Sequence, residues 1–579
     1  MISLNELNTA SVDGFVATLG GIFEHSPWVA ERAAADRPFG SRLELLDRMR
    51  AVVAAASIDE QLALIRAHPE LAGRAAIRNE LTPDSTREQK GAGLHACTRE
   101  EFARLQELNT AYNQRFGFPF ILAVRGHDPR SILRELERRL THDINGEHAV
   151  ALEQIGRIAG FRLADVVSSP PGAEALAMIE RLARFSEDEG VLTCSFLSAA
   201  HQKAAALIRD WMLAAGLDAT IDAIGNVVGR LHAQRANAGT LMTGSHYDTV
   251  INGGRFDGRL GIVVPIAVAL ELRQRGEALP YDLEIVAFSD EEGVRFKSTF
   301  LGSSAVAGLF DAKLLDATDE KGVSLRSALH GAGLDPTQVT QLGREPSTLL
   351  GYVEVHIEQG PILLNEGRAL GVVTSIAGSV RYALSVIGLA GHAGTVPMTL
   401  RKDAAAAAAE IVLAVERRCM GMDGLVGTVG CLDVPGGAIN VIPGRCDLTL
   451  DIRAADDHVR DAALHDVLQA IEAIAARRDV RIETRKLMQA SAAPCSASMQ
   501  SRWTDSIRRA TGDPSPRRLP SGAGHDAMKL AAITDVGMLF VRCGHGGISH
   551  HPDETMTVED AELAARTLQD FLLHFGSDT

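Results

Sequence analysis

The residues best suited to chemistry in this chain follow a short apolar run near its middle. His246 and Asp257 lie on either side of a glycine-rich turn in the stretch GSHYDTVINGGRFDGRLG, which begins directly after residues 240–243. A strand end followed by a loop is where a sheet presents ligands to a cleft. An imidazole nitrogen and a carboxylate able to bridge two cations suit zinc or manganese. The alternative is an Asp/Gly-rich surface turn that carries an incidental histidine.

Three later segments carry side chains of the same kinds. Glu291 and Glu292, in SDEEG, follow an apolar strand-like run, and adjacent glutamates at a strand end repel each other unless a cation or a shared proton compensates. One glutamate can therefore bind metal while its neighbour works as a base. His356 lies in another strand-like run, and His550 belongs to GISHHP near the end of the chain. Together the four segments predict a dinuclear metal site; the alternative for the two glutamates is a solvated acidic loop.

The order of these motifs resembles the M20 metallopeptidase and amidohydrolase family, in its branch of allantoate amidohydrolases and N-carbamoyl-L-amino-acid hydrolases. The resemblance runs from about residue 175 to the end of the chain. Its matching pieces are GSHYDTV, GGRFDGRLG, SDEEGVRF, HIEQGP, GHAGTVPM, INVIPG, DIRA, SGAGHDAM and GISHHPDE. One departure is Cys194 in VLTCSF, where these enzymes usually carry an arginine; it lies outside the metal motifs.

This resemblance implies a role for each candidate residue of the metal site. Five side chains would hold two divalent cations, Mn²⁺ or Zn²⁺, with the aspartate bridging: His246, Asp257, Glu292, His356 and His550. The first cation would take His246 and His356, and the second Glu292 and His550. The family pattern S-H-x-P favours His550 over the adjacent His551. Glu291 would be the general base for a shared water whose pKa the cations lower.

Other residues of the same motifs would complete the implied site. His392, in GHAGTVPM, is similar to a family histidine that reaches in from the partner subunit to stabilise an oxyanion; the alternative is a buried turn histidine. Asn440 and Arg453 resemble the pair that grips the substrate carboxylate, since a guanidinium makes two parallel bonds to a carboxylate. His525, in SGAGHDAM, is expected to face the cleft and has no assigned step.

The first 167 residues are rich in helix formers, with two islands of a different kind. In the first island His68 stands just before a proline. In the second, Ser85 is followed three residues later by Glu88. From the residues alone, the first island is a helix end and the second is a helix-capping box.

The two islands also resemble the signature of 2-oxo-4-hydroxy-4-carboxy-5-ureidoimidazoline (OHCU) decarboxylase, an all-helical enzyme of urate breakdown. The matching segments, in the family's order, are AHPELAG, SxxEQxxAGL, NTAY to RFGFPFILAV, and IGRIAGFRLADVV. The resemblance implies that His68 is the catalytic acid/base, that Glu88 orients the substrate and that Arg162 holds a carboxylate. No cofactor is expected for this reaction. Five more residues would line the pocket: Pro69, Gln89, Phe120, Ile121 and Val124.

A chain of 579 residues should form several domains, because single cores seldom exceed roughly 250–300 residues. We predict an all-α helical domain over residues 1–167 and a proline-stiffened linker, SSPPG, over 168–172. An α/β metal-binding domain would follow over 173–376 and 494–579. Residues 377–493 would form an inserted α+β lid. For this lid the family implies four strands, two helices and a role in dimerisation.

The predicted elements of the α/β domain and the lid follow from their hydrophobic patterns. Apolar runs predict strands over 240–243, 283–288 and 536–541, and the first turn is followed by a helical pattern. Within the lid, residues 381–388 and 446–453 alternate as strands do, and residues 403–418 form an alanine-rich helical stretch.

Charge and composition exclude some classes of protein. A net charge of −16 and a pI near 5.6 argue against nucleic acid or an anionic membrane surface as a partner. The 7 cysteines form no CxxC pair, so neither a disulfide framework nor a cysteine zinc site is indicated. No secretory signal is visible at the N-terminus, and the longest apolar run, residues 262–270, is too short to span a bilayer. We expect a cytoplasmic protein.

The two resemblances together imply a bifunctional enzyme of purine (urate) catabolism, a carboxy-lyase joined to a metal-dependent hydrolase and expected to form a homodimer. Its first activity would convert OHCU to (S)-allantoin, and its second would convert allantoate to ureidoglycine, ammonia and CO2. Allantoate is favoured only by its association with the decarboxylase half. The alternatives are an N-carbamoyl-L-amino-acid or ureidoglycolate amidohydrolase, and a helical half that is a non-catalytic docking module.

Overall fold

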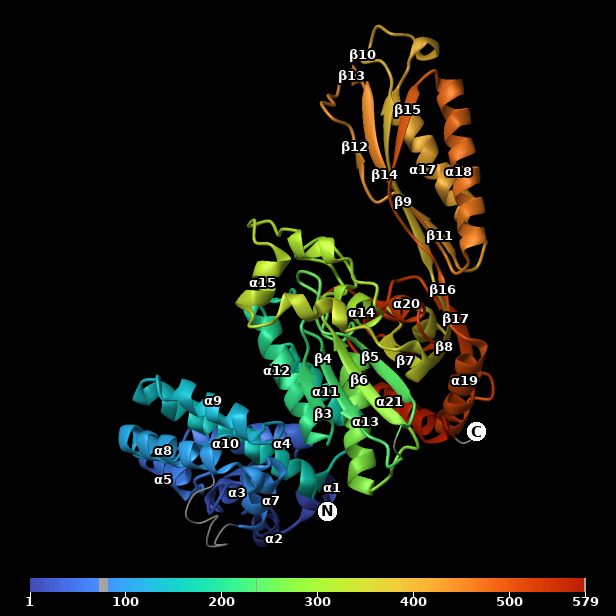
Figure 1. The fold of residues 1–579 in the computed structure, drawn as a ribbon. Coiled ribbons are helices and arrows are strands. Elements are labelled where there is room, and N and C mark those ends of the chain that lie inside the picture. Colours follow the sequence, from blue (N-terminus) through green and yellow to red (C-terminus); the bar gives the residue numbers. More distant parts are fainter. Residues whose placement is uncertain (72–81, 236, 577–579) are drawn as a thin grey trace.

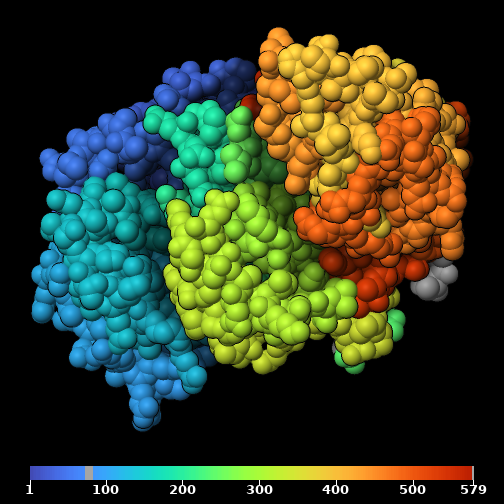
Figure 2. All heavy atoms as spheres, turned by 90° about the horizontal axis from the view of Figure 1, so that it is seen from above, coloured from blue at the N-terminus to red at the C-terminus, as the bar shows by residue number. Residues whose placement is uncertain are grey.

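The computed structural model describes residues 1–71, 82–235 and 237–576 (Figure 1). The ribbon has three parts: a helical section, a sheet with helices packed against it, and an elongated unit that extends away from the sheet. The chain returns from the elongated unit to the sheet part, which contains the last strands and helices. The helical section and the elongated unit lie on opposite sides of the sheet part (Figure 2). Ala72 and Gly73 of the AHPELAG motif lie outside the described residues.

The helical section is built from capped helices, most of which begin at a serine, threonine or aspartate whose side chain accepts a backbone N–H. The helices are α1 (Leu4–Thr9), α2 (Val12–Leu19), α3 (Trp28–Ala33), α4 (Arg42–Ala54), α5 (Ile58–Ala67), α7 (Pro83–Gly91), α8 (Arg99–Phe116), α9 (Pro129–Arg139) and α10 (Ile144–Val166). Two short strands, β1 (Ile2–Ser3) and β2 (Val167–Ser168), pair in parallel. This pair joins the start of the chain to the end of α10, so the section is not purely helical.

The predicted capping box at Ser85 and Glu88 is wrong. Helix α7 begins two residues earlier, at Pro83, and its N-cap is Thr82, whose side chain accepts the N–H of Ser85 at 3.3 Å. Proline suits the first helical position because its missing N–H would have no partner there. The side chains of Ser85 and Glu88 are thereby left for the interior of the section.

The segment predicted to be a linker, residues 168–172, is packed against the rest of the protein. Ser168 belongs to β2, and α11 (Pro171–Leu182) begins at the end of the segment. The N–H of Gly172 donates to Glu562 at 2.7 Å, and a Cβ on this glycine would collide with the Glu562 backbone. The connection is therefore a close contact rather than a spacer.

The central sheet has nine strands, and its core is parallel in the order β18-β7-β5-β6. The strands are β3 (Asp218–Ile221), β4 (Val227–Leu231), β5 (Thr240–His246), β6 (Asp282–Phe288), β7 (Leu349–Ile357), β8 (Leu370–Ile376), β16 (Ala493–Pro494), β17 (Arg517–Ser521) and β18 (Val536–Val541). All three strands predicted here are confirmed. Strands β5 and β18 are buried along their whole length, as expected for parallel strands covered on both faces.

Helices pack against this sheet and join it to the helical section. The main ones are α11, α12 (Ala199–Ala214), α13 (Leu260–Arg275), α19 (Ala497–Thr511) and α21 (Val558–His574); shorter ones are α14 (Leu301–Val306), α15 (Leu325–Gly331), α16 (Ile362–Asn365) and α20 (Ala527–Leu530). Helix α13 is the predicted helix after the glycine-rich turn, and it is buried over most of its length. One continuous apolar cluster runs from Leu7 and Phe15 in the helical section to Leu568 and Leu572 in α21.

The elongated unit contains most of the predicted lid and has a separate apolar core. Its sheet has the order β11-β14-β9-β15, with α17 (Ala404–Cys419) and α18 (Asp457–Arg478) packed on it (Figure 1). The strands are β9 (Gly378–Ile387), β11 (Leu425–Thr428), β14 (Arg445–Ala454) and β15 (Arg481–Ala490). A fifth strand, β12 (Leu432–Asp433), pairs with β14. This sheet therefore has one short strand more than the four that were expected. The short pair β10 (Gly391–His392) and β13 (Val441–Ile442) lies at the end farthest from the central sheet (Figure 1).

Among the residues that the structure describes, we find no helix with both the length and the apolar character needed to cross a membrane.

Candidate active sites

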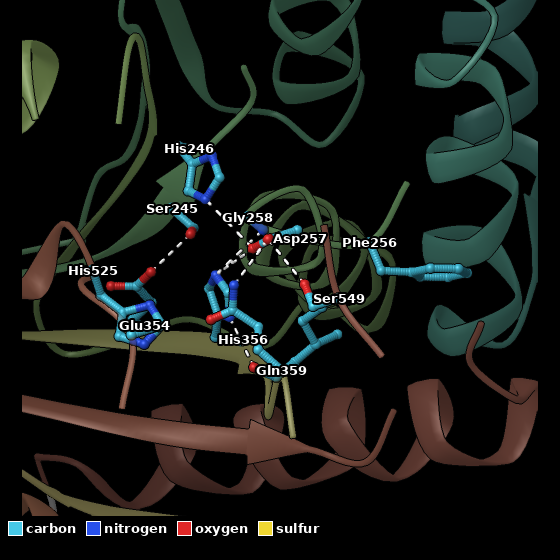
Figure 3. Close-up of polar contacts among 12 residues, drawn as sticks. Ser245, His246, Phe256, Asp257, Gly258, Glu354, His356, Gln359, His525 and Ser549 are labelled. Carbon is cyan, nitrogen blue, oxygen red and sulfur yellow. Dashed lines mark hydrogen bonds and ion pairs between the residues drawn. The ribbon is translucent and has the colours of Figure 1, made fainter. Parts of the chain in front are cut away.

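The five predicted metal ligands lie together where the parallel strands end. Figure 3 shows three of them, His246, Asp257 and His356. His246 is the last residue of β5, and His356 is the last but one of β7. Asp257 precedes α13, Glu292 follows β6, and His550 follows β18. The carboxyl ends of neighbouring parallel strands meet at one edge of the sheet, which brings residues about 300 positions apart into one cluster.

Asp257 is at the centre of this cluster, and its two oxygens face different partners. The Nε2 atoms of His246 and His356 lie 3.7 and 3.3 Å from Oδ1. His550 Nε2 lies 3.0 Å from Oδ2 and 3.5 Å from Glu292 Oε1. Oδ1 itself is buried and has no hydrogen-bond partner among the described residues. The nitrogens of His246 and His356 lie near Oδ1, and the nitrogen of His550 and the carboxylate of Glu292 lie near Oδ2. This arrangement fits two cations, one near each oxygen of Asp257.

The orientation of two histidines supports the same interpretation. Nδ1 of His246 lies 3.2 Å from the carbonyl oxygen of Asp248, and Nδ1 of His356 lies 2.8 Å from that of Ile357. A ring nitrogen that donates to a carbonyl leaves the other with a free lone pair. In both residues that other atom, Nε2, faces Asp257; Nε2 of His356 also accepts the N–H of Gly258 at 3.3 Å.

Asp248 is a functional residue that the sequence interpretation missed. Its carboxylate accepts the backbone N–H groups of Glu291 and Glu292, both at 3.1 Å, and lies 3.5 Å from His246 Nδ1. It therefore joins the loop after β5 to the loop after β6. The available signal was its spacing, because a carboxylate two residues after a histidine ligand is placed to orient that ring.

Three more residues missed by the sequence interpretation hold Asp257 in place. Gln359 and Ser549 donate to its Oδ2 at 2.9 and 3.1 Å. Glu554 accepts the N–H of Asp257 at 3.1 Å and the hydroxyl of Ser549 at 2.9 Å. Gln359 and Glu554 belong to the HIEQGP and GISHHPDE motifs, so their positions beside ligands were the signal.

Glu291 and Glu292 do not form a solvated acidic loop. Glu291 is 9% exposed, and burial raises its pKa well above the ordinary value, with the charge of Glu292 adding to the effect. Burial also raises the pKa of Glu292, to about 7. His246, Glu291 and Glu292 form a further group of adjacent potential ligands.

The two remaining histidines of these motifs differ in position. His551 is exposed, belongs to none of the groups of adjacent potential ligands among the described residues, and its Nδ1 lies 3.6 Å from a carboxylate oxygen of Asp553. His525 is buried; its ring centroid is 4.4 Å from that of His356, and its Nε2 lies 2.7 Å from the hydroxyl of Ser521. Beside His525 and His356, the buried carboxylate of Glu354 accepts a hydrogen bond from the hydroxyl of Ser245 at 2.7 Å (Figure 3).

Cys194, the departure from the family pattern, is fully buried. Its N–H donates to the hydroxyl of Thr249 at 3.0 Å, and burial raises the pKa of its thiol to about 11. The guanidinium of Arg259, also fully buried, is one of the charges that act on this thiol.

The three predicted residues of the elongated unit are not part of the metal cluster in this chain. His392 and Asn440 are exposed and lie beside each other at the β10–β13 end, where Ala393 N donates to Asn440 O at 3.0 Å. His392 is thus not the buried turn histidine of the alternative interpretation. Arg453 lies nearer the sheet, where it donates to both oxygens of Asp451 at 3.1 and 3.0 Å and to the carbonyl of Gly522 at 2.9 Å.

The helical section forms a second site, in which all eight predicted residues line one small cavity. His68 is the C-cap of α5, Glu88 and Gln89 belong to α7, and Arg162 belongs to α10. The others are the half-buried Pro69 and three buried residues between α8 and α9: Phe120, Ile121 and Val124. One side of the cavity is therefore apolar and the other carries charged groups.

Arg162 is fixed by two carboxylates. It donates to both oxygens of Glu88 at 2.9 and 3.0 Å, to Glu24 at 2.6 Å and to the hydroxyl of Ser85 at 3.2 Å. Burial opposes the charged form of Arg162, yet Glu88 and Glu24 raise its pKa above the usual value. Glu24, which is buried and also accepts the hydroxyl of Thr82 at 2.8 Å, was missed by the sequence interpretation. No local pattern marks it.

His68 is in its neutral form at neutral pH. Burial lowers the pKa of its imidazole to about 4. Nδ1 lies 3.0 Å from the carbonyl of Leu64, whereas Nε2 is buried without a hydrogen-bond partner among the described residues. A neutral imidazole with one unpaired nitrogen at a cavity presents a lone pair to a bound molecule, although the lowered pKa makes it a weaker base than a free histidine.

Comparisons with known proteins divide the chain in the same way. Residues 8–164 match the family profile of OHCU decarboxylase, and residues 242–574 match that of peptidase family M20/M25/M40. Allantoate deiminase 2 of Glycine max is 41% identical over 428 residues, which cover 69% of this chain and 88% of that protein. N-carbamoyl-L-amino acid amidohydrolase of Geobacillus stearothermophilus is 40% identical over 379 residues, or 66% of this chain and 92% of that protein.

Solved structures are similar over the same part of the chain. An amidase of the hydantoinase/carbamoylase family from Burkholderia multivorans matches with a TM-score of 0.65 at 30% identity, covering 69% of this chain and 97% of that chain. AtUAH in complex with glyoxylate matches with a TM-score of 0.58 at 31% identity, covering 70% and 97%.

Proposed function

Because the chain belongs to peptidase family M20/M25/M40 and carries an OHCU decarboxylase domain ahead of it, which makes it a lyase and a hydrolase, we propose that one protein catalyses two steps of urate breakdown. The helical domain decarboxylates OHCU to (S)-allantoin. The metal-binding domain hydrolyses allantoate to ureidoglycine, ammonia and CO2. The two steps are not consecutive, because opening of the allantoin ring lies between them.

The single observation that carries the hydrolase proposal is the arrangement around Asp257. Two histidine nitrogens lie near one of its oxygens, and a histidine nitrogen with a second carboxylate lies near the other. His246, Asp257 and His356 would hold one divalent cation, and Asp257, Glu292 and His550 a second, either Mn²⁺ or Zn²⁺. When bound, such cations lower the pKa of water and polarise a carbonyl oxygen.

Glu291 is the proposed general base and acid. Its carboxylate is buried beside His246 and Glu292, and burial favours its neutral, protonated form. An Oε atom of Glu291 would therefore take a proton readily and pass it to the nitrogen of the leaving group. Asp248 supports this role, since its carboxylate fixes the backbone of both glutamates.

The elongated unit is proposed to act as a lid and as the dimer contact. Its exposed apolar side chains are typical of a surface that another protein covers. They include Leu389, Met398, Leu400, Leu432 and Ile439. In such a homodimer His392 would stabilise an oxyanion in the partner's active site, and Asn440 would bind the substrate carboxylate together with Arg453. Arg453 would exchange its contact with Asp451 for the substrate carboxylate.

The decarboxylase proposal rests on the assembled pocket of the helical domain. Arg162 would hold a substrate carboxylate, Glu88 would orient the ring, and the neutral His68 would exchange a proton through Nε2. The buried residues Phe120 and Ile121 exclude water from the other side. Apolar surroundings disfavour a carboxylate relative to uncharged CO2, which assists the loss of CO2. A docking module would have no need of such a cavity.

A substrate panel tests the hydrolase proposal. The whole protein, loaded with manganese, is assayed with allantoate, ureidoglycolate and N-carbamoyl-L-amino acids. Allantoate should give the highest kcat/KM, by about tenfold or more, which corresponds to about 1.4 kcal/mol of transition-state binding. A higher kcat/KM for N-carbamoyl amino acids would favour the second candidate, an N-carbamoyl-L-amino-acid amidohydrolase, for which the Geobacillus stearothermophilus relative is the specific support.

A further inference from the structure

A second cavity lies between the helical domain and the metal-binding domain, directly outside the decarboxylase pocket. Glu88 and Arg162, which line that pocket, also line this cavity. Its far wall comes from the metal-binding domain and includes Ala219 and Thr220 on β3 and Arg273 on α13. We call it the interdomain vestibule. It shares the charged groups of the decarboxylase pocket, so a molecule in the vestibule is beside Glu88 and Arg162.

The far wall is fixed to the pocket rim by specific contacts. Arg125 and Arg273, one from each domain, both donate to Asp165, at 3.1 and 2.7 Å. Arg273 also donates to the carbonyl of Ala164 at 3.2 Å. At Gly126 on the rim, an added Cβ would lie 2.9 Å from a methyl group of Leu213. The metal-binding domain is thus held close to the decarboxylase pocket.

The vestibule is separate from the metal centre. Helix α13 begins at Leu260, three residues after Asp257, and Arg273 lies in its last turn. With a rise of 1.5 Å per residue, the two ends of that stretch are roughly 20 Å apart. None of the proposed metal ligands lines the vestibule. Any effect of its far wall on chemistry therefore concerns the decarboxylase.

The charges that line the vestibule balance one another, whereas the protein as a whole is acidic. Four arginines and four carboxylates line it, although the whole chain has a net charge of −16. At Asp165 the guanidiniums of Arg125 and Arg273 share one carboxylate, whereas deeper in the guanidinium of Arg162 is shared by the carboxylates of Glu88 and Glu24. An anion approaching this opening avoids the repulsion that most of the surface would exert.

We propose that the interdomain vestibule is the entrance through which the anionic substrate reaches the decarboxylase pocket, so that the metal-binding domain supplies one wall of the decarboxylase's substrate path. This inference rests on the proposed decarboxylase function. It makes Thr220 a residue that controls access, although it belongs to the other enzyme's domain and touches no catalytic group.

Narrowing the entrance tests the proposal on the full-length protein. Thr220 is exposed on the vestibule wall, so Thr220→Trp should obstruct it without altering a core. We expect kcat/KM for OHCU to fall by about fivefold or more, while kcat at saturating substrate changes by less than about twofold. Allantoate hydrolysis should be unchanged. The matched control is Thr340→Trp, an exposed threonine of the same domain outside the vestibule, in the 3₁₀ helix Pro336–Gln341.

A charge pair at the same position gives an independent test. Thr220→Lys should raise kcat/KM for OHCU and Thr220→Glu should lower it, by about twofold each, and both effects should disappear in high salt. If Thr220→Trp impairs both reactions through misfolding, the Lys and Glu variants still test whether the vestibule is the entrance. Unchanged kcat/KM in both charge variants would overturn the proposed entrance. Failure of the wild type and of Thr340→Trp to release CO2 from OHCU would instead overturn the proposed decarboxylase function.

Discussion

The two candidate sites differ in the charge of the buried atoms that are left without a hydrogen-bond partner among the described residues. In the decarboxylase pocket, Arg162 finds hydrogen-bond acceptors on Glu88, Glu24 and Ser85. In the metal centre, an oxygen of Asp257 is buried without a partner, and three histidines face a single carboxylate. Unpaired buried polar groups are costly, so the second arrangement calls for cations where the first needs none. In the decarboxylase pocket the unpaired atom is the neutral Nε2 of His68, which the proposed substrate would meet; in the proposed metal centre it is a carboxylate oxygen, which the proposed cations would meet.

Removing metal is the strongest test of this contrast. A chelator should abolish allantoate hydrolysis, because the proposed water activation requires both cations. Decarboxylation of OHCU should stay within about twofold of its original rate, since Arg162 and Glu88 need no ion. The two rates are measured on one preparation, and Mn²⁺ or Zn²⁺ is then added back. Loss of both activities on chelation would contradict the contrast.

Substituting His68 should produce the opposite pattern. His68→Asn removes the free ring nitrogen at the pocket, so CO2 release should slow by about 10²–10⁴-fold. Hydrolysis should be unaffected because the sites share no residue. His95→Asn, an exposed histidine of the same domain, is the matched control. A His68→Asn protein that still decarboxylates at the wild-type rate would remove His68 from the mechanism.

Asp248 tests how the metal centre is supported. Asp248→Asn keeps the shape of the side chain but weakens its hold on His246 and on the backbone of Glu291 and Glu292. Metal affinity, measured by titration of the metal-free protein, should fall by about 10–100-fold, as for other residues that orient a ligand. Decarboxylation serves as the internal control. Unchanged metal affinity would show that the carboxylate only shapes the loop.

The buried His68 also predicts a pH dependence of stability. Its folded pKa is about 4, below the ordinary 6.5, so between these values the unfolded chain binds more protons than the folded one. The contribution of the neutral His68 to the free energy of unfolding is complete above pH 6.5 and is lost as the pH falls toward 4. At pH 5 it amounts to a loss on the order of 1–2 kcal/mol relative to pH 7. Denaturant unfolding of wild type and His68→Asn should show a shallower pH slope in the variant; equal slopes would contradict the assignment.

Subunit mixing tests the dependence of the hydrolase on a second copy. Glu291→Gln and His392→Ala proteins should each be inactive in hydrolysis, yet their mixture should recover about a quarter of wild-type activity, since half of the randomly formed dimers hold one intact site. Each variant taken alone through the same subunit exchange is the control. If exchange is demonstrated and no activity returns, His392 does not act across the interface.

Local patterns in the sequence predicted the strands and the His, Asp and Glu side chains that gather at their ends, whereas the assignment of those side chains as metal ligands came from the family resemblance and stays a prediction. The same patterns failed where the partner is far away in the chain. Nothing beside Glu24 indicates its pairing with Arg162, 138 residues later. The segment at Gly172 was interpreted as a linker from its prolines, although its contact is with Glu562. The wrong helix start at Ser85 has a local cause. Thr82 caps the helix and Pro83 takes its first position, three and two residues before Ser85.

The contact between α11 and α21 has a consequence for synthesis of the protein. Gly172 and Glu562 are 390 residues apart. A ribosome that adds about 5–20 residues per second needs roughly 20–80 s to cover that distance. During this time the part of α11 that packs on α21 is uncovered, although its other neighbours, α4 and α13, are made earlier than α21. The nascent chain must therefore carry an uncovered hydrophobic surface until its last helix emerges, which makes it a substrate for chaperones that bind such surfaces.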